Sequence, residues 1–198
     1  MPEQLDRRAR FPTDLDLSPY VRSCLRRLPK TSGLDVLDIP SGFGRHSLFL
    51  AAQDNQVVAA DIDQHRLDQS LASWRTLMPR QGNLRPVLVD AEQSLPFSRE
   101  AFDLVLVVHY VSDKIIEAVC PLIRAGGFLV YETFSAHGLN SRNLPIAGQT
   151  ANRVSGFEVL DLRERPVRSA AGEVVTVKML ARKLATAKPP LRNAPQVS

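Results

Sequence analysis

Short apolar runs alternate with helical segments through the middle of this 198-residue chain. The apolar runs are residues 34–39, 56–60, 86–89, 102–109 and 128–134. The spacing of apolar residues predicts helices between them, at about residues 45–53, 64–77 and 112–124. Continuously apolar strands separated by helices are typical of a parallel sheet that is covered on both faces. The pattern therefore predicts the α/β class, with a doubly wound sheet.

The end of the chain has a different pattern. Residues 157–162 and 174–180 are apolar runs with no long helix between them, and the segment that joins them can turn through Ala171 and Gly172. Two strands joined by a short turn pair in antiparallel fashion. The sheet is therefore expected to be mostly parallel, with a C-terminal antiparallel hairpin.

The length of the chain suits a single domain with one core. Residues 1–33 are predicted to form an N-terminal arm and a helix, in which Ser18 and Pro19 provide a cap and a first turn. Residues 34–182 carry the alternating pattern and are expected to form the domain proper. Residues 183–198 are rich in proline, alanine and polar side chains, so this tail is predicted to be disordered.

The composition is that of an ordinary globular protein, with 44% hydrophobic and 23% charged residues. The net charge of +4 depends on three cations in the tail, so the folded part is nearly neutral and a nucleic-acid partner is not favoured. No apolar run approaches the roughly 20 residues of a membrane helix, and the charged start lacks the apolar core of a signal peptide. We therefore expect a cytoplasmic protein without membrane contact. Cys24, Cys120 and the four scattered histidines predict neither a disulfide nor a metal site.

The most informative segment joins the apolar run at residues 34–39 to the next helix. Gly42 and Gly44 permit backbone conformations and close approaches that a Cβ atom would block. A helix that begins near Arg45 offers free N–H groups to a ligand. This arrangement is typical of a nucleotide-type binding loop. The dinucleotide pattern G-x-G-x-x-G is absent because Ser47 holds the third glycine position, which argues against a nicotinamide site.

The same loop resembles motif I of class I, Rossmann-like methyltransferases, usually written (D/E)-x-G-x-G-x-G. Asp38, Pro40, Gly42 and Gly44 hold its four positions, and Pro40 replaces the usual first glycine. The resemblance implies that these residues, together with Ser41, bind S-adenosylmethionine. Proline is compatible with an extended approach to the turn, so its presence leaves the fold prediction intact.

Two acids follow the second apolar run, at the tip of the predicted strand. Asp61 ends the run directly and can accept hydrogen bonds from both ribose hydroxyls of a bound cofactor. Ile62 follows it and is a candidate cofactor contact. Asp63 is the alternative ribose ligand, although its place before the helix that begins near Gln64 fits a helix cap better.

A third matching segment, DAEQSLPF, leads into the fourth strand. By resemblance to the same methyltransferases, Asp90 accepts a hydrogen bond from the adenine amino group and the backbone N–H of Ala91 reaches a ring nitrogen. Leu95 and Phe97 are expected to pack this loop. Asp103, which starts the fourth strand, is expected to be structural.

The fourth match, PLIRAGGFL, resembles a family segment in which Gly126 and Gly127 end one helix and start the next strand. The four matches cover about residues 34–134 in the family's order. The chain thus resembles class I S-adenosylmethionine-dependent methyltransferases, and it is similar to compact bacterial enzymes of the tellurite-resistance and thiopurine type. The resemblance implies S-adenosylmethionine as the cofactor and leaves the methyl acceptor unidentified.

Methyl transfer mainly requires an acceptor that is held in line with the activated methyl group, and in some cases the removal of a proton. In this fold the methyl group lies over the carboxyl ends of the fourth and fifth strands. His109, at the end of the fourth run, is the first candidate for an acceptor contact or a general base, and it is also a candidate cofactor contact. A histidine satisfied at a strand end is the alternative. Tyr110 is the second catalytic candidate, with a core position as its alternative.

Other polar residues near these strand ends are weaker candidates. Glu132 faces the site, or is a solvated strand-end acid or helix cap. Arg45 and His46 either meet the methionine end of the cofactor or lie on the helix surface. The loop after the fifth strand either selects the substrate or is a plain connection. Its polar residues include His137, Asn140 and Arg142.

Four functions are compatible with these sequence features. A small-molecule methyltransferase is favoured because the chain is short and shows no appended recognition domain. A noncatalytic S-adenosylmethionine-binding protein predicts an occluded acceptor pocket, and a nicotinamide-dependent dehydrogenase is a weaker fourth hypothesis. An RNA or protein methyltransferase predicts a basic face near the pocket, formed by the C-terminal tail together with Arg7, Arg8, Arg10, Arg26 and Arg27.

Overall fold

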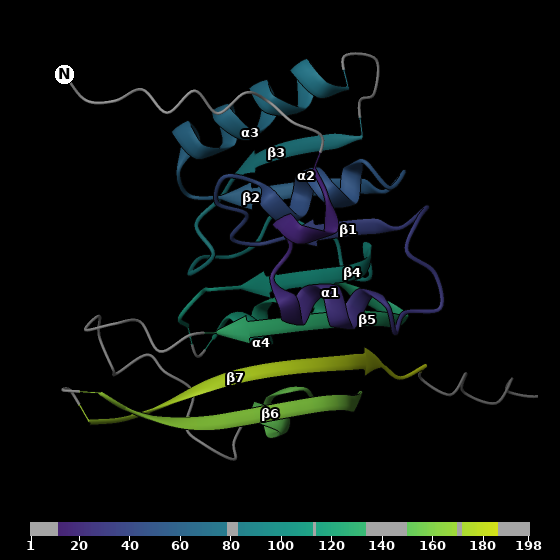
Figure 1. Cartoon of the computed structure of the whole chain (residues 1–198). Helices are drawn as coiled ribbons and strands as arrows, with labels where there is room; N and C mark the ends of the chain where they lie inside the picture. Colours follow the sequence, from purple (N-terminus) through teal and green to yellow (C-terminus); the bar gives the residue numbers. More distant parts are fainter. Residues whose placement is uncertain (1–11, 79–82, 113, 134–149, 170–171, 186–198) are drawn as a thin grey trace, which may run out of the picture.

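A seven-stranded sheet forms the centre of the molecule (Figure 1), with the strand order β3-β2-β1-β4-β5-β7-β6. The computed structural model describes residues 12–78, 83–112, 114–133, 150–169 and 172–185. The strands are β1 (Asp35–Asp38), β2 (Gln56–Asp61), β3 (Leu84–Leu88), β4 (Phe102–Val108), β5 (Ile123–Thr133), β6 (Phe157–Ser169) and β7 (Gly172–Lys183). The helices are η1 (Asp14–Asp16), α1 (Pro19–Leu25), α2 (Arg45–Ala51), α3 (Gln64–Leu77), α4 (Ile115–Val119), η2 (Cys120–Leu122) and η4 (Thr150–Arg153).

The first five strands are parallel and the last two are antiparallel, as the sequence predicts. β1 pairs with β2 and β4, β2 pairs with β3, and β4 pairs with β5, all in parallel register. β7 pairs antiparallel with both β5 and β6. β6 therefore forms the edge of the sheet, and β7 lies between β6 and β5. The C-terminal hairpin is thus confirmed. The tip at Ala171, where we expected the turn, lies outside the described residues.

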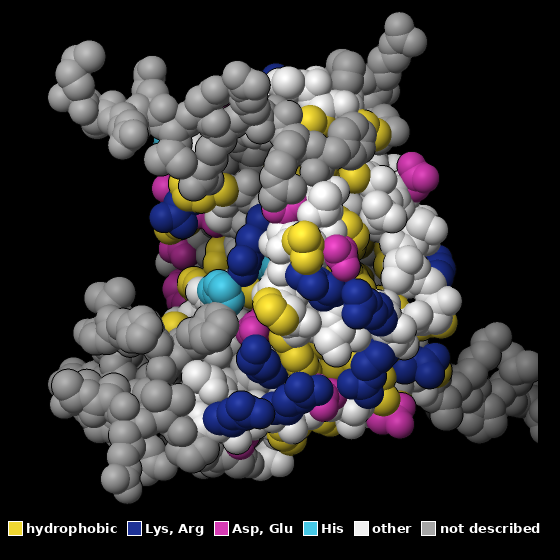
Figure 2. Space-filling view, in the orientation of Figure 1, with side chains coloured by type: hydrophobic (Ala, Val, Ile, Leu, Met, Phe, Trp, Pro, Cys, Tyr) yellow, Lys and Arg dark blue, Asp and Glu magenta, His cyan; other side chains and the backbone are white. Residues whose placement is uncertain are grey.

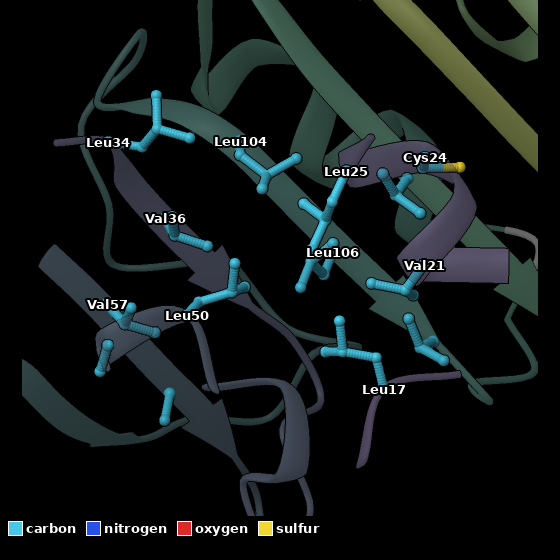
Figure 3. Close-up of a cluster of buried hydrophobic side chains, with 14 of the residues drawn as sticks. Leu17, Val21, Cys24, Leu25, Leu34, Val36, Leu50, Val57, Leu104 and Leu106 are labelled. Atoms are coloured by element: carbon cyan, nitrogen blue, oxygen red, sulfur yellow. The ribbon is translucent and has the colours of Figure 1, made fainter. Parts of the chain in front are cut away.

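Two apolar clusters cover the two faces of the sheet. On one face, Val36, Leu104 and Leu106 lie against side chains of α1 and α2, including Val21 and Leu50 (Figure 3). The strand residues between them face the other way and pack with α4. These opposite-facing residues are Leu37, Val105 and Val107. Burial on both faces explains why the strands are continuously apolar rather than alternating.

Helix α1 packs on the same face as α2 and α3. Ser18 caps it by accepting a hydrogen bond from Val21 N–H at 3.0 Å, and Pro19 occupies its first turn, as predicted. Tyr20 and Cys24 are almost fully buried with the sheet residues. The N-terminal helix is therefore part of the central core.

The expected role of the paired glycines is wrong. Gly126 and Gly127 lie inside β5, which already begins at Ile123, and the preceding helix is far shorter than predicted. The register between β4 and β5 shifts at this point. A Cβ atom on Gly127 would lie 2.9 Å from the carbonyl oxygen of Asp103, so the close approach of β4 requires glycine there. The pair accommodates a strand irregularity instead of ending a helix.

In the part of the chain that the structure describes, no helix is long and apolar enough to cross a bilayer. Within the same residues, no group of three or more histidine, cysteine or acidic side chains is placed to hold a metal ion. Cys24 and Cys120 are both free thiols.

Candidate active site

The carboxyl ends of β1 to β5 meet at one edge of the sheet, on the left in Figure 1. The strand order reverses direction between β1 and β4, and ligands of open α/β sheets bind beside such a reversal, at the carboxyl ends of the strands. The candidate residues leave the sheet here, on the segments that follow β1, β2, β3 and β4. The edge therefore brings together motifs that are up to about 70 residues apart in the sequence.

The loop between β1 and α2 is held against both neighbouring strands. Ile39 N–H donates to Leu106 O at 3.0 Å, and Ser41 N–H donates to Ala60 O at 2.8 Å. Gly42 and Gly44 have φ values of 56° and 76°, in the left-handed region that favours glycine. The predicted need for glycine is confirmed at both positions. Pro40 lies in the turn itself.

Gly44 has a second reason to lack a side chain. A Cβ atom at this position would overlap the hydroxyl oxygen of Ser70 on α3 and lie 3.0 Å from Ser70 Cβ. At Gly42, by contrast, an added Cβ meets no atom within 4 Å. The loop is thus packed tightly against α3 at one glycine and is open at the other.

Asp38 lies at the end of β1, fully buried beneath the loop. Ser47 Oγ on α2 donates a hydrogen bond of 2.5 Å to Asp38 Oδ2, so Ser47 has a defined role at the position where a dinucleotide site would have glycine. Burial raises the pKa of Asp38 to about 7, against the opposing effect of the Ser47 hydrogen bond. The second carboxyl oxygen of Asp38 is buried and has no hydrogen-bond partner among the described residues.

Asp61 connects the tip of β2 to the glycine loop. Its Oδ2 accepts a hydrogen bond of 2.7 Å from Gly42 N–H, and its Oδ1 accepts one of 3.0 Å from Asp63 N–H. The next residue, Ile62, is 65% exposed, which is unusual for an isoleucine beside a buried strand. Asp63 accepts from Arg66 N–H and caps α3, as the sequence predicts.

The segment after β3 returns toward the same edge. Asp90 is partly buried, and its Oδ1 accepts a hydrogen bond of 2.9 Å from Glu92 N–H. Ala91, Leu95 and Phe97 pack against the apolar cluster on the α4 face. The packing role of the last two is confirmed.

Asp103 is structural, as expected, and lies at the opposite end of β4. It accepts a hydrogen bond from Asp35 N–H at 2.9 Å and forms an ion pair of 3.0 Å with Arg124. The same arginine also pairs with the carboxylate of Asp35 at 2.8 Å. These contacts join three neighbouring strands far from the glycine loop.

His109 lies one residue beyond the end of β4, with a left-handed φ of 59°. Its backbone N–H donates to Glu132 O at 2.7 Å, and its side chain is exposed at the sheet edge. The guanidinium of Arg45 lies 3.3 Å from His109 Nδ1. Partial burial and the charge of Arg45 lower the pKa of His109 below its ordinary value.

Tyr110 joins the end of β4 to the segment after β3. Its hydroxyl donates a hydrogen bond of 2.6 Å to Glu92 Oε1, and its ring packs on the α4-face cluster. Burial and this hydrogen bond raise the pKa of Tyr110, so the phenol stays protonated at neutral pH.

Glu132 is the centre of a buried polar network that the sequence did not predict. The carboxylate is 1% exposed, and it accepts a 2.5 Å hydrogen bond from Ser18 Oγ and forms a 2.8 Å ion pair with Lys178. Ser18 N–H donates to His46 Nε2 at 3.3 Å, and burial lowers the pKa of His46 to about 3. His46 is therefore a neutral buried residue, and a helix-surface position for it is wrong.

The loop after β5 and the cavity near α1 contribute no described residue to the candidate site. His137, Asn140 and Arg142 lie outside the described residues. A cavity of about 180 Å³ between η1, α1 and α2 is lined by none of the candidate site residues and includes Leu17, Phe49 and Arg22. The candidate site is thus the sheet edge and not this cavity.

Comparison with known proteins gives a family match in the central part of the chain. Residues 36–127 match the methyltransferase domain family. This segment contains the glycine loop, Asp61, Asp90 and His109. No curated protein sequence matches the chain.

Solved structures share the fold at low sequence identity. An S-adenosylmethionine-dependent methyltransferase from Mesorhizobium loti is 18% identical, with a TM-score of 0.63, over 85% of this chain and 100% of that one. TehB from Haemophilus influenzae is 15% identical, with a TM-score of 0.63, over 84% of this chain and 62% of TehB. The [4+2]-cyclase SpnF is 18% identical, with a TM-score of 0.65, over 83% of this chain and 79% of SpnF.

The family match and the shared fold confirm the methyltransferase resemblance and the enzyme class expected from the four sequence motifs. Residues 36–127 match the methyltransferase domain family, and the chain shares the class I, Rossmann-like fold of S-adenosylmethionine-dependent methyltransferases.

Proposed function

We propose that this chain transfers the methyl group of S-adenosylmethionine to a small-molecule acceptor at the carboxyl edge of β1, β2, β3 and β4. The observation that carries the proposal is the convergence of the glycine loop, Asp61, Asp90 and His109 on this one edge, although they leave four different strands. Each belongs to a segment that resembles the family's cofactor-binding motifs.

The residues present fit the cofactor. A carboxylate has about four lone-pair sites, so Asp61 keeps acceptor capacity for ribose hydroxyls beside its two backbone contacts. Ser41 Oγ is a buried hydroxyl without a hydrogen-bond partner among the described residues, which a polar ligand group would supply. The exposed Ile62 offers an apolar contact beside Asp61.

The remaining candidates are proposed to contact the adenine or to support the glycine loop. Asp90 and the backbone N–H of Ala91 are proposed to contact the adenine. Asp38 and Pro40 are proposed to hold the loop from below, since Asp38 already binds Ser47 of α2. Gly42 and Gly44 allow the backbone of the loop to approach the ligand closely.

The cofactor supplies a methyl group that is already activated by its sulfonium. The chain therefore mainly has to bind the two substrates, orient them and exclude water. His109 and Tyr110 follow β4 on the acceptor side and are the proposed acceptor contacts. The phenol of Tyr110 stays protonated, and its hydroxyl donates to Glu92. In this position Tyr110 can contact the acceptor with its ring. Its hydroxyl can donate to the acceptor only if it releases Glu92.

One observation favours a small acceptor. The match to the Mesorhizobium loti methyltransferase covers 100% of that chain, so that methyltransferase carries no further domain beside the shared fold. An RNA or protein acceptor and a noncatalytic binding role remain the alternatives. SpnF shows that this fold also serves a cyclase, so fold alone does not define the reaction. The cytoplasmic location expected from the sequence stays a prediction.

Ligand binding tests the proposal directly. We expect the purified protein to bind S-adenosylhomocysteine and to bind NAD at least about 10-fold more weakly, because the third pyrophosphate-binding glycine is replaced by Ser47. Calorimetric titration with each ligand measures both affinities. A screen for methyl transfer from labelled S-adenosylmethionine to metabolite pools and to bulk RNA then identifies the acceptor class. Preference for NAD contradicts the cofactor, and labelling of RNA alone contradicts the small acceptor.

A further inference from the structure

We propose that Arg45 and His109 together form a subsite for an anionic group, a carboxylate or an oxyanion, at the carboxyl edge of β4. The inference rests on the proposed function and specifies the chemistry of one ligand group at that site. It depends on the direction of one hydrogen bond and on the balance of charge around Arg45.

The contact between the two side chains has only one chemical direction. A guanidinium carries five N–H donors and no acceptor, so Arg45 donates and His109 Nδ1 accepts. The imidazole is therefore neutral, and its proton lies on Nε2, which is a donor. This agrees with the lowered pKa of His109. A histidine fixed in this tautomer is not poised as a general base, because its basic nitrogen already binds Arg45.

The pair consequently presents hydrogen-bond donors alone. Arg45 uses one of its five N–H groups on His109, and this contact also holds the guanidinium in place at the end of β4. Such an arrangement matches carboxylates and oxyanions, which accept hydrogen bonds and do not donate them when ionised. Arg45 is exposed at the start of α2, so a ligand can reach it.

The charge around Arg45 also favours an anion. Arg45 has no carboxylate within ion-pair distance among the described residues, whereas Arg66 pairs with Asp63 at 3.1 Å. The nearby Asp38 interacts with the Arg45 charge, but its pKa of about 7 leaves it only partly ionised at neutral pH. The nearby Glu132 is already neutralised by Lys178, and burial keeps His46 uncharged.

The other cations on this side of the molecule differ from Arg45. Figure 2 shows Lys and Arg side chains on the face that carries α1 and the β6–β7 hairpin. Several of them already have carboxylate partners: Arg22 and Arg26 pair with Asp14, Arg163 pairs with Asp161, and Lys178 pairs with Glu132. Their charges are therefore balanced within the protein, which leaves Arg45 as the cation that a ligand anion would meet at the carboxyl edge of β4.

Two ligand groups have the required chemistry. One is the carboxylate on the methionine end of the cofactor, and the other is an anionic group on the methyl acceptor. Both would be held by the same donors, so the experiment must separate them. Methylthioadenosine serves this purpose because it keeps the nucleoside and the thioether of S-adenosylhomocysteine and lacks the carboxylate.

The test uses Arg45→Gln, with Arg75→Gln as the matched control. Arg75 is an exposed arginine in the last turn of α3, so its replacement removes the same charge away from the edge. Calorimetry measures the affinities of S-adenosylhomocysteine and of methylthioadenosine, and then of inorganic phosphate for the S-adenosylhomocysteine complex. Circular dichroism confirms that each variant is folded.

Two results support the subsite and name its occupant. If Arg45→Gln lowers the affinity for S-adenosylhomocysteine by about 10-fold or more and leaves the affinity for methylthioadenosine unchanged, the occupant is the cofactor carboxylate. If the variant leaves both of these affinities unchanged and lowers the affinity for phosphate by a similar factor, the occupant is the acceptor's anion. The control is expected to match the wild type throughout.

Two other results overturn the subsite. In the first, Arg45→Gln binds all three ligands with the same affinities as Arg75→Gln. In the second, Arg45→Gln binds S-adenosylhomocysteine and methylthioadenosine more weakly by the same factor, which indicates a disturbed glycine loop. Failure of the proposed function looks different, because the wild-type protein would then bind neither nucleoside. In that case phosphate binding to the free protein, compared between the wild type and Arg45→Gln, still decides whether the subsite exists.

Discussion

Replacing Gly44 with alanine is expected to lower the free energy of unfolding by about 2–4 kcal/mol, since it adds both backbone strain and overpacking. The φ of 76° lies in the left-handed region, where a Cβ atom is unfavourable. The same Cβ would overlap the hydroxyl of Ser70. Either the glycine loop or α3 must move to accommodate it, so S-adenosylhomocysteine binding should also weaken. Chemical denaturation and calorimetry measure the two effects.

Two other glycines serve as controls that separate the cost of backbone strain from the cost of the overlap with Ser70. Gly33 and Gly42 also have left-handed φ values, and at both an added Cβ meets no atom within 4 Å. Their alanine variants should each cost only the strain, about 1 kcal/mol. In a Ser70→Ala background the cost of Gly44→Ala should fall by about 1 kcal/mol or more, because the overlapping oxygen is gone. If Gly44→Ala costs no more than Gly33→Ala, the packing explanation is wrong.

Replacing Asp61 with alanine is expected to weaken S-adenosylhomocysteine binding by about 10- to 100-fold, which corresponds to about 1–3 kcal/mol. The variant loses the proposed ribose contacts, and it also releases Gly42 N–H from its 2.7 Å hydrogen bond. The loop is then held less firmly at the position where the ligand is proposed to bind. Calorimetric titration measures the loss of affinity directly.

Asp63→Ala is the control for this effect. Asp63 is only two residues away, but its carboxylate caps α3 and pairs with Arg66. Its loss should cost about 1 kcal/mol of stability through the missing cap, and S-adenosylhomocysteine affinity should stay within about 3-fold, since an exposed pair of this kind contributes little. A larger loss of affinity in Asp63→Ala than in Asp61→Ala would show that the wrong acid was assigned to the ribose.

The sequence by itself determined the features that depend on local patterns. Continuous apolar runs and intervening helices determined a parallel sheet, because such strands need cover on both faces. The caps at Ser18 and Asp63 were also readable, since a short polar side chain before a helix satisfies the free N–H groups of its first turn. Gly42 and Gly44 were recognised because a strand that turns sharply into a helix needs positive φ.

Tertiary structure decided the features that depend on partners distant in the sequence. Gly126 and Gly127 looked like a helix end, but the neighbouring strand β4 makes them an irregularity within β5. Glu132 looked like a strand-end acid, but it is buried and accepts a hydrogen bond from Ser18, which lies 114 positions earlier in the chain.

The same holds for the chemistry of the site. A histidine after an apolar strand is equally compatible with a base, a donor or a structural residue as long as its neighbours are unknown. Arg45, 64 positions away, donates to His109 Nδ1 and so fixes which nitrogen carries the proton. Local spacing cannot encode this, because the contact exists only once β1 and β4 are paired and bring α2 against the end of β4.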